Sequence, residues 1–371
     1  MDVTARLQDL LDAAVADGYT ASAVCAAAVD GEALPVVASG LALRFGADGR
    51  VLPPAGQVPA TPQTRYDLAS VTKPFSALAL LALVRDGLLD LDEPVAARLP
   101  AFAAPGGTAD PRRRAVTLQH LLTHTSGLPG TWTGWRQRWP GRPEALDSLL
   151  SVPLAAAPGT VFTYSCVGYN TAMALAEAAT GSSWPDLVHR LVLEPLALTG
   201  QITFRPRPSD CAATECGTAD GRPLVRGEVH DESAWAMGGA AANAGLFGTA
   251  AGVLRFAEAL RGGVPRLLPA PLAGLFWDDG LDAVLGPASA AARSAAGYGQ
   301  TLGLRIGQLG WMGRKATAAR GHNGFTGTAF LTDRRHRISV VLLANRVHPS
   351  RTGPDFAPIR AMVNEAVYAS S

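Results

Sequence analysis

The chain has 371 residues, 48% of them hydrophobic and 17% charged, and its 32 basic and 31 acidic residues leave a formal net charge of +1. This composition excludes a disordered chain, and the near-zero charge provides no strong attraction to nucleic acid or to an acidic membrane. Because single hydrophobic cores usually stop growing below this length, we expect one large domain or two fused ones.

The N-terminal segment, residues 3–16, alternates polar and apolar residues at helical spacing. This pattern predicts an amphipathic helix and lacks the basic start and apolar centre of a signal peptide. No run of 18 or more uninterrupted apolar residues occurs later in the chain, so we predict no transmembrane helix. We expect a cytoplasmic protein with neither a nucleic-acid nor a membrane partner, and the sequence leaves its oligomeric state open.

Strand patterns occur near both ends of the chain. Residues 21–29 and 34–43 are apolar runs separated by Asp30-Gly31, a strong hairpin signal. Further strand candidates lie at 301–308, 327–332 and 337–344, and an amphipathic helix is expected at 358–369. We predict an antiparallel five-stranded sheet flanked by the two terminal helices.

Helical patterns fill the middle of the chain, at residues 70–86, 118–122, 165–180, 184–192 and 250–260. Stretches rich in proline and glycine, which predict loops, lie at 52–62, 104–111 and 205–223. The predicted fold class is α+β. Residues 1–60 and 295–371 would form a discontinuous sheet domain, residues 61–294 an inserted, mainly helical domain, and the active site would lie at their junction.

The four cysteines, Cys25, Cys166, Cys211 and Cys216, have neither CxxC spacing nor the density of a disulfide framework. We expect reduced thiols, although Cys211 and Cys216 could form a bridge if the protein met an oxidant. Histidine, cysteine and acidic residues show no metal-ligand spacing, so we predict no metal and no cofactor.

The first chemical signal is Ser70 and Lys73, at i and i+3 near the start of a predicted helix. This spacing places the amine on the same helical face as the hydroxyl. A serine hydroxyl is a poor nucleophile until a base takes its proton, and lysine can be that base if burial and the helix dipole lower its pKa. The non-catalytic alternative is a serine that caps the N-terminus of the helix, beside a lysine on the surface.

Lysine usage argues against that alternative. Lysine occurs only at positions 73 and 315, and arginine is the cation everywhere else. The sequence has therefore retained at position 73 an amine that can lose its proton, which a guanidinium cannot do.

Two further segments complete the pattern. Tyr164-Ser165-Cys166 stands at the start of a later predicted helix, and residues 321–328, reading GHNGFTGT, lead into a strand. Taken singly, Tyr164 could be a core or cap aromatic and His322 a loop residue.

With these segments in this order, the chain resembles the serine β-lactamase and penicillin-binding protein superfamily, specifically the branch of class C β-lactamases and their esterase relatives. The similar segments are residues 64–95, 121–129, 162–170, 229–249 and 321–328. The resemblance implies a β-lactamase/transpeptidase-like fold.

The resemblance also implies roles. Ser70 would attack an acyl carbonyl, Lys73 and Tyr164 would shuttle its proton, and the backbone N–H groups of Ser70 and Phe325 would form the oxyanion hole. His322-Asn323-Gly324 would correspond to the family's KTG-like element, with histidine where many members carry lysine, as esterase-like members commonly do. The segment 121–128, which contains His124 and Ser126, would be structural.

One position departs from the family pattern. Cys166 occupies the third position of the YxN element, usually an asparagine that holds a substrate amide or the lysine. A thiol cannot replace the paired donor and acceptor of a carboxamide, so recognition of a β-lactam side-chain amide is in doubt. Asn170, one helical turn later, could compensate in part.

We therefore predict a serine hydrolase, a carboxylesterase related to β-lactamases, that acts on small-molecule esters or amides through an acyl-Ser70 intermediate. The alternative is an acyltransferase or amide-forming enzyme of a biosynthetic pathway that uses the same acyl-enzyme. A β-lactamase, a D-Ala peptidase and a non-catalytic binding module are less favoured. Trp132, Trp135 and Trp139 could wall an acyl or acceptor pocket, or could form a packing cluster. Cys166, Asn323, Gly324, Trp132 and Trp135 are thus candidate substrate-binding residues.

Overall fold

The computed structural model describes residues 2–104, 110–286 and 299–370. Its α-helices are α1 (Val3–Ala16), α2 (Thr72–Arg85), α3 (Val95–Arg98), α4 (Pro100–Ala103), α5 (Leu118–Leu122), α6 (Arg142–Leu150), α7 (Cys166–Thr180), α8 (Trp184–Val188), α9 (Glu232–Ala236), α10 (Ala250–Arg261), α11 (Ala270–Gly274), α12 (Gly280–Leu285), α14 (Leu309–Met312) and α15 (Ala357–Tyr368). Its strands are β1 (Ser22–Val29), β2 (Glu32–Ala33), β3 (Val37–Leu43), β4 (Val58–Pro59), β5 (Tyr66–Asp67), β6 (Ile202–Thr203), β7 (Ala213–Cys216), β8 (Leu224–Arg226), β9 (Phe247–Gly248), β10 (Gly299–Gln300), β11 (Arg305–Ile306), β12 (Arg320–Asn323), β13 (Ala329–Asp333) and β14 (Ile338–Ala344).

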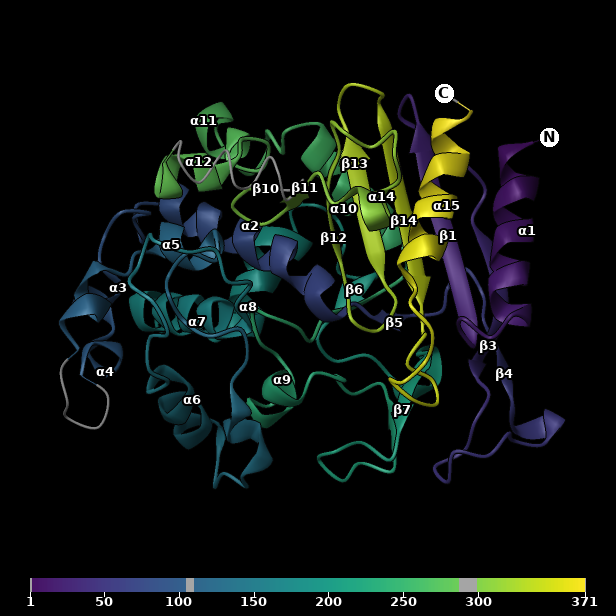
Figure 1. The fold of residues 1–371 in the computed structure, drawn as a ribbon, viewed down its shortest axis with the longest axis horizontal. Helices are drawn as coiled ribbons and strands as arrows, with labels where there is room; N and C mark the ends of the chain where they lie inside the picture. The colour runs from purple at the N-terminus through teal and green to yellow at the C-terminus, as the bar shows by residue number, and fades with distance from the viewer. Residues whose placement is uncertain (1, 105–109, 287–298, 371) are drawn as a thin grey trace.

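The main sheet is antiparallel and joins both ends of the chain (Figure 1). Its strand order is β10-β11-β12-β13-β14-β1-β3-β4, with β2 paired to β1 beyond the turn at Asp30-Gly31. The predicted fold class is confirmed, but the sheet of the described residues has nine strands and not five. Four of the five predicted strands are present at its centre, as β1, β3, β13 and β14.

The observed sheet differs from the predicted one at the edge formed by β10, β11 and β12, next to the helical part of the chain. The predicted strand 301–308 is reduced to β11, and the preceding β10 begins at Gly299. β12 was not expected from the sequence, because Arg320, His322 and Asn323 are polar and the segment lacks the apolar pattern of a strand. Gly321 is needed there, since a Cβ at this position would lie 2.3 Å from the Phe330 carbonyl oxygen.

Alternating side chains of the sheet enter two separate cores. Ala23, Cys25 and Ala27 of β1 pack with Leu11 of α1 and Val363 of α15 in one core. On the opposite face, the alternate residues of β1 belong to the larger core that also contains α2, α7 and α10. This period of two places the terminal helices together on one face (Figure 1).

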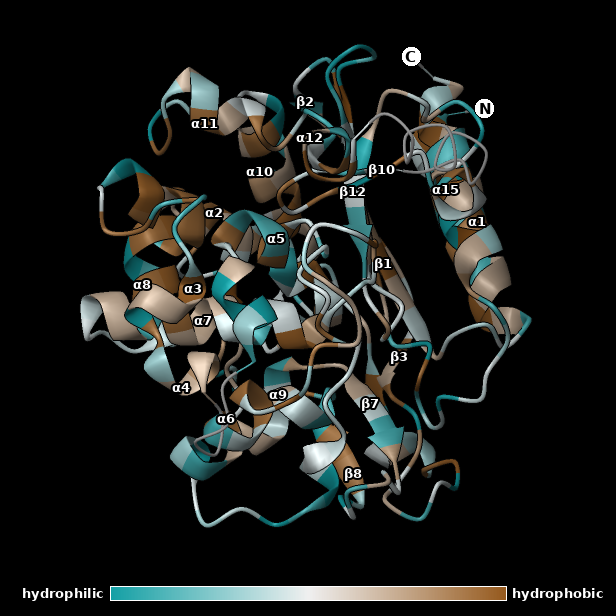
Figure 2. Cartoon of the chain, turned by 60° about the vertical axis from the view of Figure 1, so that its left-hand side comes forward, coloured by the Kyte–Doolittle hydropathy of each residue, from teal (hydrophilic) through white to brown (hydrophobic). Residues whose placement is uncertain are grey.

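The helical part is built around α2 and α7. α2 is buried on nearly every side and is coloured as hydrophobic over most of its length in Figure 2. A helix that is hydrophobic all round belongs in the interior, so the two helices that carry the SxxK and YxN positions are fixed by the core. No helix among the described residues is long and apolar enough to cross a membrane.

The predicted division into two domains stays a prediction. The proposed boundary at 294/295 lies outside the described residues. α10 falls in the predicted helical domain by sequence but packs on β1, β13 and β14 of the sheet.

Candidate active site

Ser70 lies in a short 3₁₀ turn, η2 (Ala69–Val71), that leads directly into α2. Ala69 has a φ of +46°, which is uncommon for a residue with a Cβ. The buried carboxylate of Asp67 accepts hydrogen bonds from the N–H groups of Ala69, at 2.8 Å, and of His230, at 2.6 Å. These bonds hold the strained turn, and with it Ser70, in one position.

The buried Lys73 ammonium is surrounded by acceptors. Its Nζ donates to Ser70 Oγ at 3.1 Å, to the Asn243 carbonyl at 3.0 Å and to Cys166 Sγ at 3.4 Å. The ring of Tyr164 lies 4.9 Å from Nζ, within the range of a cation–π contact.

Burial on its own lowers the pKa of Lys73, but the interactions with Cys166 and Tyr164 outweigh burial and raise the pKa above the ordinary lysine value. The lowered pKa that Lys73 would need to act as the base is therefore not favoured by this geometry. Lys73 is an ammonium group that donates to the nucleophile.

The segment Tyr164-Ser165-Cys166 is held at the start of α7 by the preceding loop. Ser165 N donates to His124 Nδ1 at 3.0 Å, and Ser165 Oγ donates to the Pro129 carbonyl at 2.7 Å. Cys166 N donates to the Gly130 carbonyl at 2.8 Å. The predicted structural role of the segment that contains His124 agrees with these contacts.

Tyr164 lies between cationic and aromatic groups. Its ring centroid is 4.5 Å from that of His124, and the guanidinium carbon of Arg305 lies 4.5 Å from the Tyr164 ring. The Tyr164 hydroxyl oxygen is buried and makes no hydrogen bond among the described residues. Its interaction with the Lys73 ammonium contributes to the raised pKa of that lysine.

The turn after β12 lies against the segment that directly precedes Ser70. Thr326 Oγ1 donates to the Asp67 carbonyl at 2.8 Å, and Thr328 Oγ1 donates to the Leu68 carbonyl at 2.9 Å. In the part of the chain that is described, neither the Ser70 N–H nor the Phe325 N–H donates a hydrogen bond. Two unpaired amides beside a nucleophile are the donors that an oxyanion needs.

His322 is fully buried at the end of β12. Its Nδ1 makes a 2.9 Å hydrogen bond with the Asn323 carbonyl, and its ring centroid lies 6.1 Å from that of Tyr164. Burial, together with the charges of Arg305 and Lys73, holds the pKa of His322 well below its usual value. At neutral pH the imidazole is neutral, so it cannot provide the charge of the lysine that many family members carry there.

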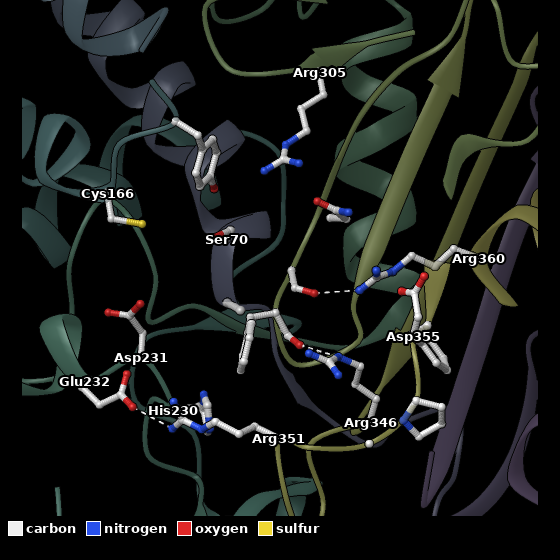
Figure 3. Close-up of a pocket in the computed structure, with 18 residues that line it drawn as sticks. Ser70, Cys166, His230, Asp231, Glu232, Arg305, Arg346, Arg351, Asp355 and Arg360 are labelled. Carbon is white, nitrogen blue, oxygen red and sulfur yellow. Dashed lines mark hydrogen bonds and ion pairs between the residues drawn. The ribbon is translucent and has the colours of Figure 1, made fainter. Parts of the chain in front are cut away.

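These groups meet in a pocket of about 680 Å³ (Figure 3). Its walls include the nucleophile, the tyrosine, the cysteine and the turn after β12: Ser70, Tyr164, Cys166, Asn323, Gly324 and Phe325. Lys73 and His322 lie behind this wall. The structure thus brings together every predicted site residue except two.

Trp132 and Trp135 do not line this pocket. Trp132 is buried in the core, where its ring stacks on Trp139 at 6.0 Å and its Nε1 donates to Ser148 of α6 at 3.4 Å. Trp135 and Trp139 line a separate pocket of about 640 Å³ together with Trp235. Packing of this loop against α6 therefore directs the tryptophans away from Ser70, which fits the alternative of a packing cluster and not that of a wall of the Ser70 pocket.

Asn170 does not stand in for the missing asparagine. Its Oδ1 accepts a hydrogen bond from Asn243 N at 3.1 Å, and it does not line the pocket. Because the Asn243 carbonyl accepts from Lys73, Asn170 acts on the lysine only through the backbone.

The pocket is also lined by arginines that were not expected from the sequence: Arg305, Arg346, Arg351 and Arg360. Arg351 is paired with Glu215 and Glu232. Within the described ranges, the other three have no carboxylate within ion-pair distance, and Figure 3 shows the Arg305 side chain directed toward Ser70. They come from β11, from the loop after β14 and from α15, so no local spacing could have identified them.

The chain is similar to known proteins over nearly its whole length. A family model described as Beta-lactamase matches residues 7–361. The chain is 33% identical to Esterase EstB of Burkholderia gladioli, over 99% of this chain and 95% of that protein, and 28% identical to an N-acetylmuramyl-L-alanine amidase of Bacillus subtilis, over 95% and 83%. Its fold is similar to that of EstCE1, described as a hydrolase with promiscuous acyltransferase activity, with a TM-score of 0.77, 23% identity and coverage of 99% and 98%.

Proposed function

Because this chain belongs to the Beta-lactamase family, we propose that it is a serine esterase that cleaves small-molecule esters through an acyl-Ser70 intermediate. The observation that carries the proposal is the 3.1 Å hydrogen bond from Lys73 Nζ to Ser70 Oγ, in a pocket that Tyr164 also lines. The similarity to an esterase over nearly the full length of both chains supports it.

The geometry favours Tyr164 as the group that takes the serine proton. Lys73 donates to Ser70 Oγ, so the hydroxyl hydrogen of Ser70 must point elsewhere. As Ser70 Oγ bonds to the acyl carbon, its proton passes to Tyr164 Oη while the Tyr164 hydroxyl gives its own proton to the departing alcohol oxygen, and the bond between the acyl carbon and that oxygen breaks. Water then attacks the acyl-enzyme, gives up a proton by the same route and releases the acid. The Lys73 ammonium stabilises the negative charge that develops on Ser70 Oγ and Tyr164 Oη.

Cys166 supports esters over β-lactams as substrates. Its Sγ lines the pocket and contacts Lys73 at 3.4 Å. A substrate amide at this position would lose a hydrogen-bonding partner, whereas an ester would not.

We also propose a cytoplasmic location for the protein. All four cysteines are free thiols, which fits a reducing compartment.

Transfer of the acyl group to an alcohol or amine is the second candidate. The pocket of about 680 Å³ exceeds the volume of a short acyl group and leaves space for an acceptor. The fold neighbour EstCE1, described as having acyltransferase activity, is consistent with this use of the fold.

The arginines of the pocket favour one class of substrate, whether the enzyme hydrolyses esters or transfers the acyl group. Arg305 and Arg346 line the pocket, and within the described ranges neither has a carboxylate within ion-pair distance, although Asp355 in the same wall attracts Arg346 from farther away. They would favour a substrate or acceptor that carries an acidic group. The similarity to an N-acetylmuramyl-L-alanine amidase raises the case of an amide substrate that carries a carboxylate. Cys166 disfavours such a substrate, because a thiol cannot pair with an amide as a carboxamide does.

The test is a panel of acyl esters, with and without a carboxylate, read by intact mass and by product analysis in the presence of alcohols and amines. A stable acyl adduct on Ser70 and release of the free acid support the esterase. Preferential formation of a new ester or amide at low acceptor concentration supports the transferase. The absence of any adduct, also with a fluorophosphonate, would identify a binding module.

A further inference from the structure

Arg360, in the first turns of α15, is a buried arginine in the wall of the Ser70 pocket. Only 7% of the residue is exposed, and its guanidinium lies 5.4 Å from the Phe356 ring. No carboxylate of the described chain lies within ion-pair distance of it, and its Nε is buried without a hydrogen bond. Asp355, which lines the same pocket, attracts the guanidinium from beyond that distance. A buried cation whose hydrogen bonds all go to carbonyl groups is costly, so its position requires an explanation beyond packing.

Its hydrogen bonds supply that explanation. Arg360 Nη2 donates to the Gly324 carbonyl at 2.7 Å and to the Thr328 carbonyl at 3.3 Å. Figure 3 shows the first of these bonds as a dashed line from Arg360. The Gly324 carbonyl and the Phe325 N–H are the two ends of one peptide group. The guanidinium therefore acts on the peptide whose N–H faces the nucleophile.

The rest of the turn is fixed independently. Gly324 N donates to the Thr328 carbonyl at 2.7 Å, and Thr328 Oγ1 donates to the Leu68 carbonyl. A Cβ at Gly324 would lie 2.6 Å from the Leu68 carbonyl oxygen. Arg346 Nε donates to the Phe325 carbonyl at 2.9 Å. With the turn already held by these contacts, Arg360 is not required merely to close it.

A charged donor on a carbonyl polarises the peptide and strengthens the hydrogen bond that its N–H gives. We propose that Arg360 is a positioning residue of the oxyanion hole, which polarises the Gly324–Phe325 peptide so that the Phe325 N–H stabilises the oxyanion formed at the substrate carbonyl. This inference rests on the proposed acyl-enzyme chemistry and adds to it a group that does not touch the substrate.

The consequence for kinetics is specific. The Phe325 N–H remains in every Arg360 variant, and only its polarisation and orientation change. Loss of a whole oxyanion donor costs about 10²–10³-fold in kcat, so we expect about a 5- to 30-fold loss for Arg360→Met. KM should change less than about twofold, since the oxyanion develops only in the transition state.

The test combines kinetics with infrared spectroscopy of a slowly deacylating acyl-enzyme that carries a ¹³C-labelled carbonyl. In Arg360→Met the acyl carbonyl should absorb at a higher frequency than in the wild type, and the affinity for a trifluoromethyl ketone should fall in proportion to kcat/KM. Arg360→Gln, which keeps a donor without the charge, should be intermediate. Met362→Gln, at an exposed position of the same helix, is the matched control and should leave all readouts unchanged.

A folded Arg360→Met variant with the wild-type carbonyl frequency would overturn the inference, even if its kcat fell, because a structural role alone would explain that loss. If the methionine variant does not fold, the glutamine variant is judged by the same frequency shift. A wild-type protein that forms no acyl-enzyme would instead refute the proposed function, and the inference with it.

Discussion

The hydroxyl of Thr328 donates a hydrogen bond to the carbonyl of Leu68 at 2.9 Å, across 260 residues of sequence. Leu68 stands two residues before the proposed nucleophile, and Thr328 closes the turn that contains Phe325. This bond ties the end of the sheet to the start of α2. The relative position of the two proposed oxyanion donors therefore depends on contacts between segments that are far apart in the sequence.

Ser70→Ala should abolish turnover and fluorophosphonate labelling while the protein stays folded. The variant loses the nucleophile and one acceptor of Lys73, which costs about 1 kcal/mol of stability. Intact mass, ester hydrolysis and thermal unfolding are the measurements, with the exposed Ser209→Ala as control. Hydrolysis by the alanine variant at near the wild-type rate would refute the assignment of the nucleophile.

Lys73 should remain charged through the neutral range. Its folded pKa is raised, because its interactions with Cys166 and Tyr164 outweigh burial. The stability gained in this way is present below the ordinary lysine value of about 10.4 and is lost as the pH rises through the folded pKa. Since the chain has only two lysines, NMR of lysine labelled at ¹³Cε gives two signals, and Lys315→Arg assigns them. A Lys73 midpoint near pH 7 would restore lysine as the principal base.

Tyr164→Phe should lower kcat/KM for a short ester by about 10²–10⁴-fold, the usual contribution of a general base. Acylation should slow, and a pre-steady-state burst of the leaving alcohol measures it. The matched control is Tyr169→Phe, which removes a buried hydroxyl that donates to the Leu122 carbonyl at 3.4 Å and does not line the pocket. Equal losses in both variants would show that Tyr164 has no specific role as the base.

Cys166→Asn should narrow the gap between ester and β-lactam hydrolysis. A restored carboxamide can pair with a substrate amide, and an unpaired buried amide costs about 1–3 kcal/mol, or roughly 5- to 150-fold in rate. The values to measure are kcat/KM for a p-nitrophenyl ester and a chromogenic cephalosporin in both proteins. Cys216→Asn, away from the pocket, is the control. If the ratio of the two kcat/KM values were the same in Cys166→Asn and in the wild type, Cys166 would not contact the acyl side chain of the substrate.

The protein should lose stability as the pH falls below about 6.5, in part through His348. Burial lowers the pKa of His348 to about 4, and its Nε2 accepts hydrogen bonds from the N–H groups of Arg44 and Phe45, both at 3.1 Å. Because the unfolded chain takes up this proton near pH 6.5, stability is present above that pH and is lost toward the folded value.

Between pH 7 and pH 5 this histidine should account for a loss of about 2 kcal/mol in the free energy of unfolding. Urea unfolding of the wild type and of His348→Gln at the two pH values measures it. The variant should show a smaller decrease than the wild type, whereas His189→Gln, at an exposed position, should behave like the wild type. Identical decreases in all three proteins would contradict the prediction.

The sequence by itself determined the elements whose side chains repeat at a fixed period. The period of 3.6 at residues 3–16 and the apolar run of β1 are local patterns, and both elements are present. The SxxK spacing likewise predicted that Lys73 lies beside Ser70, and the two side chains are in contact although Ser70 lies in η2, directly before α2. Polar β12 lacked such a pattern and was missed.

Only the tertiary structure decided the properties that depend on neighbours from distant segments. Lys73 is charged because Cys166, Tyr164 and the Asn243 carbonyl surround it. Arg360 reaches the oxyanion peptide from α15, and the tryptophan loop turns away from Ser70 because it packs on α6. Charge state, peptide polarisation and the shape of a pocket all depend on through-space distances, which sequence spacing does not set.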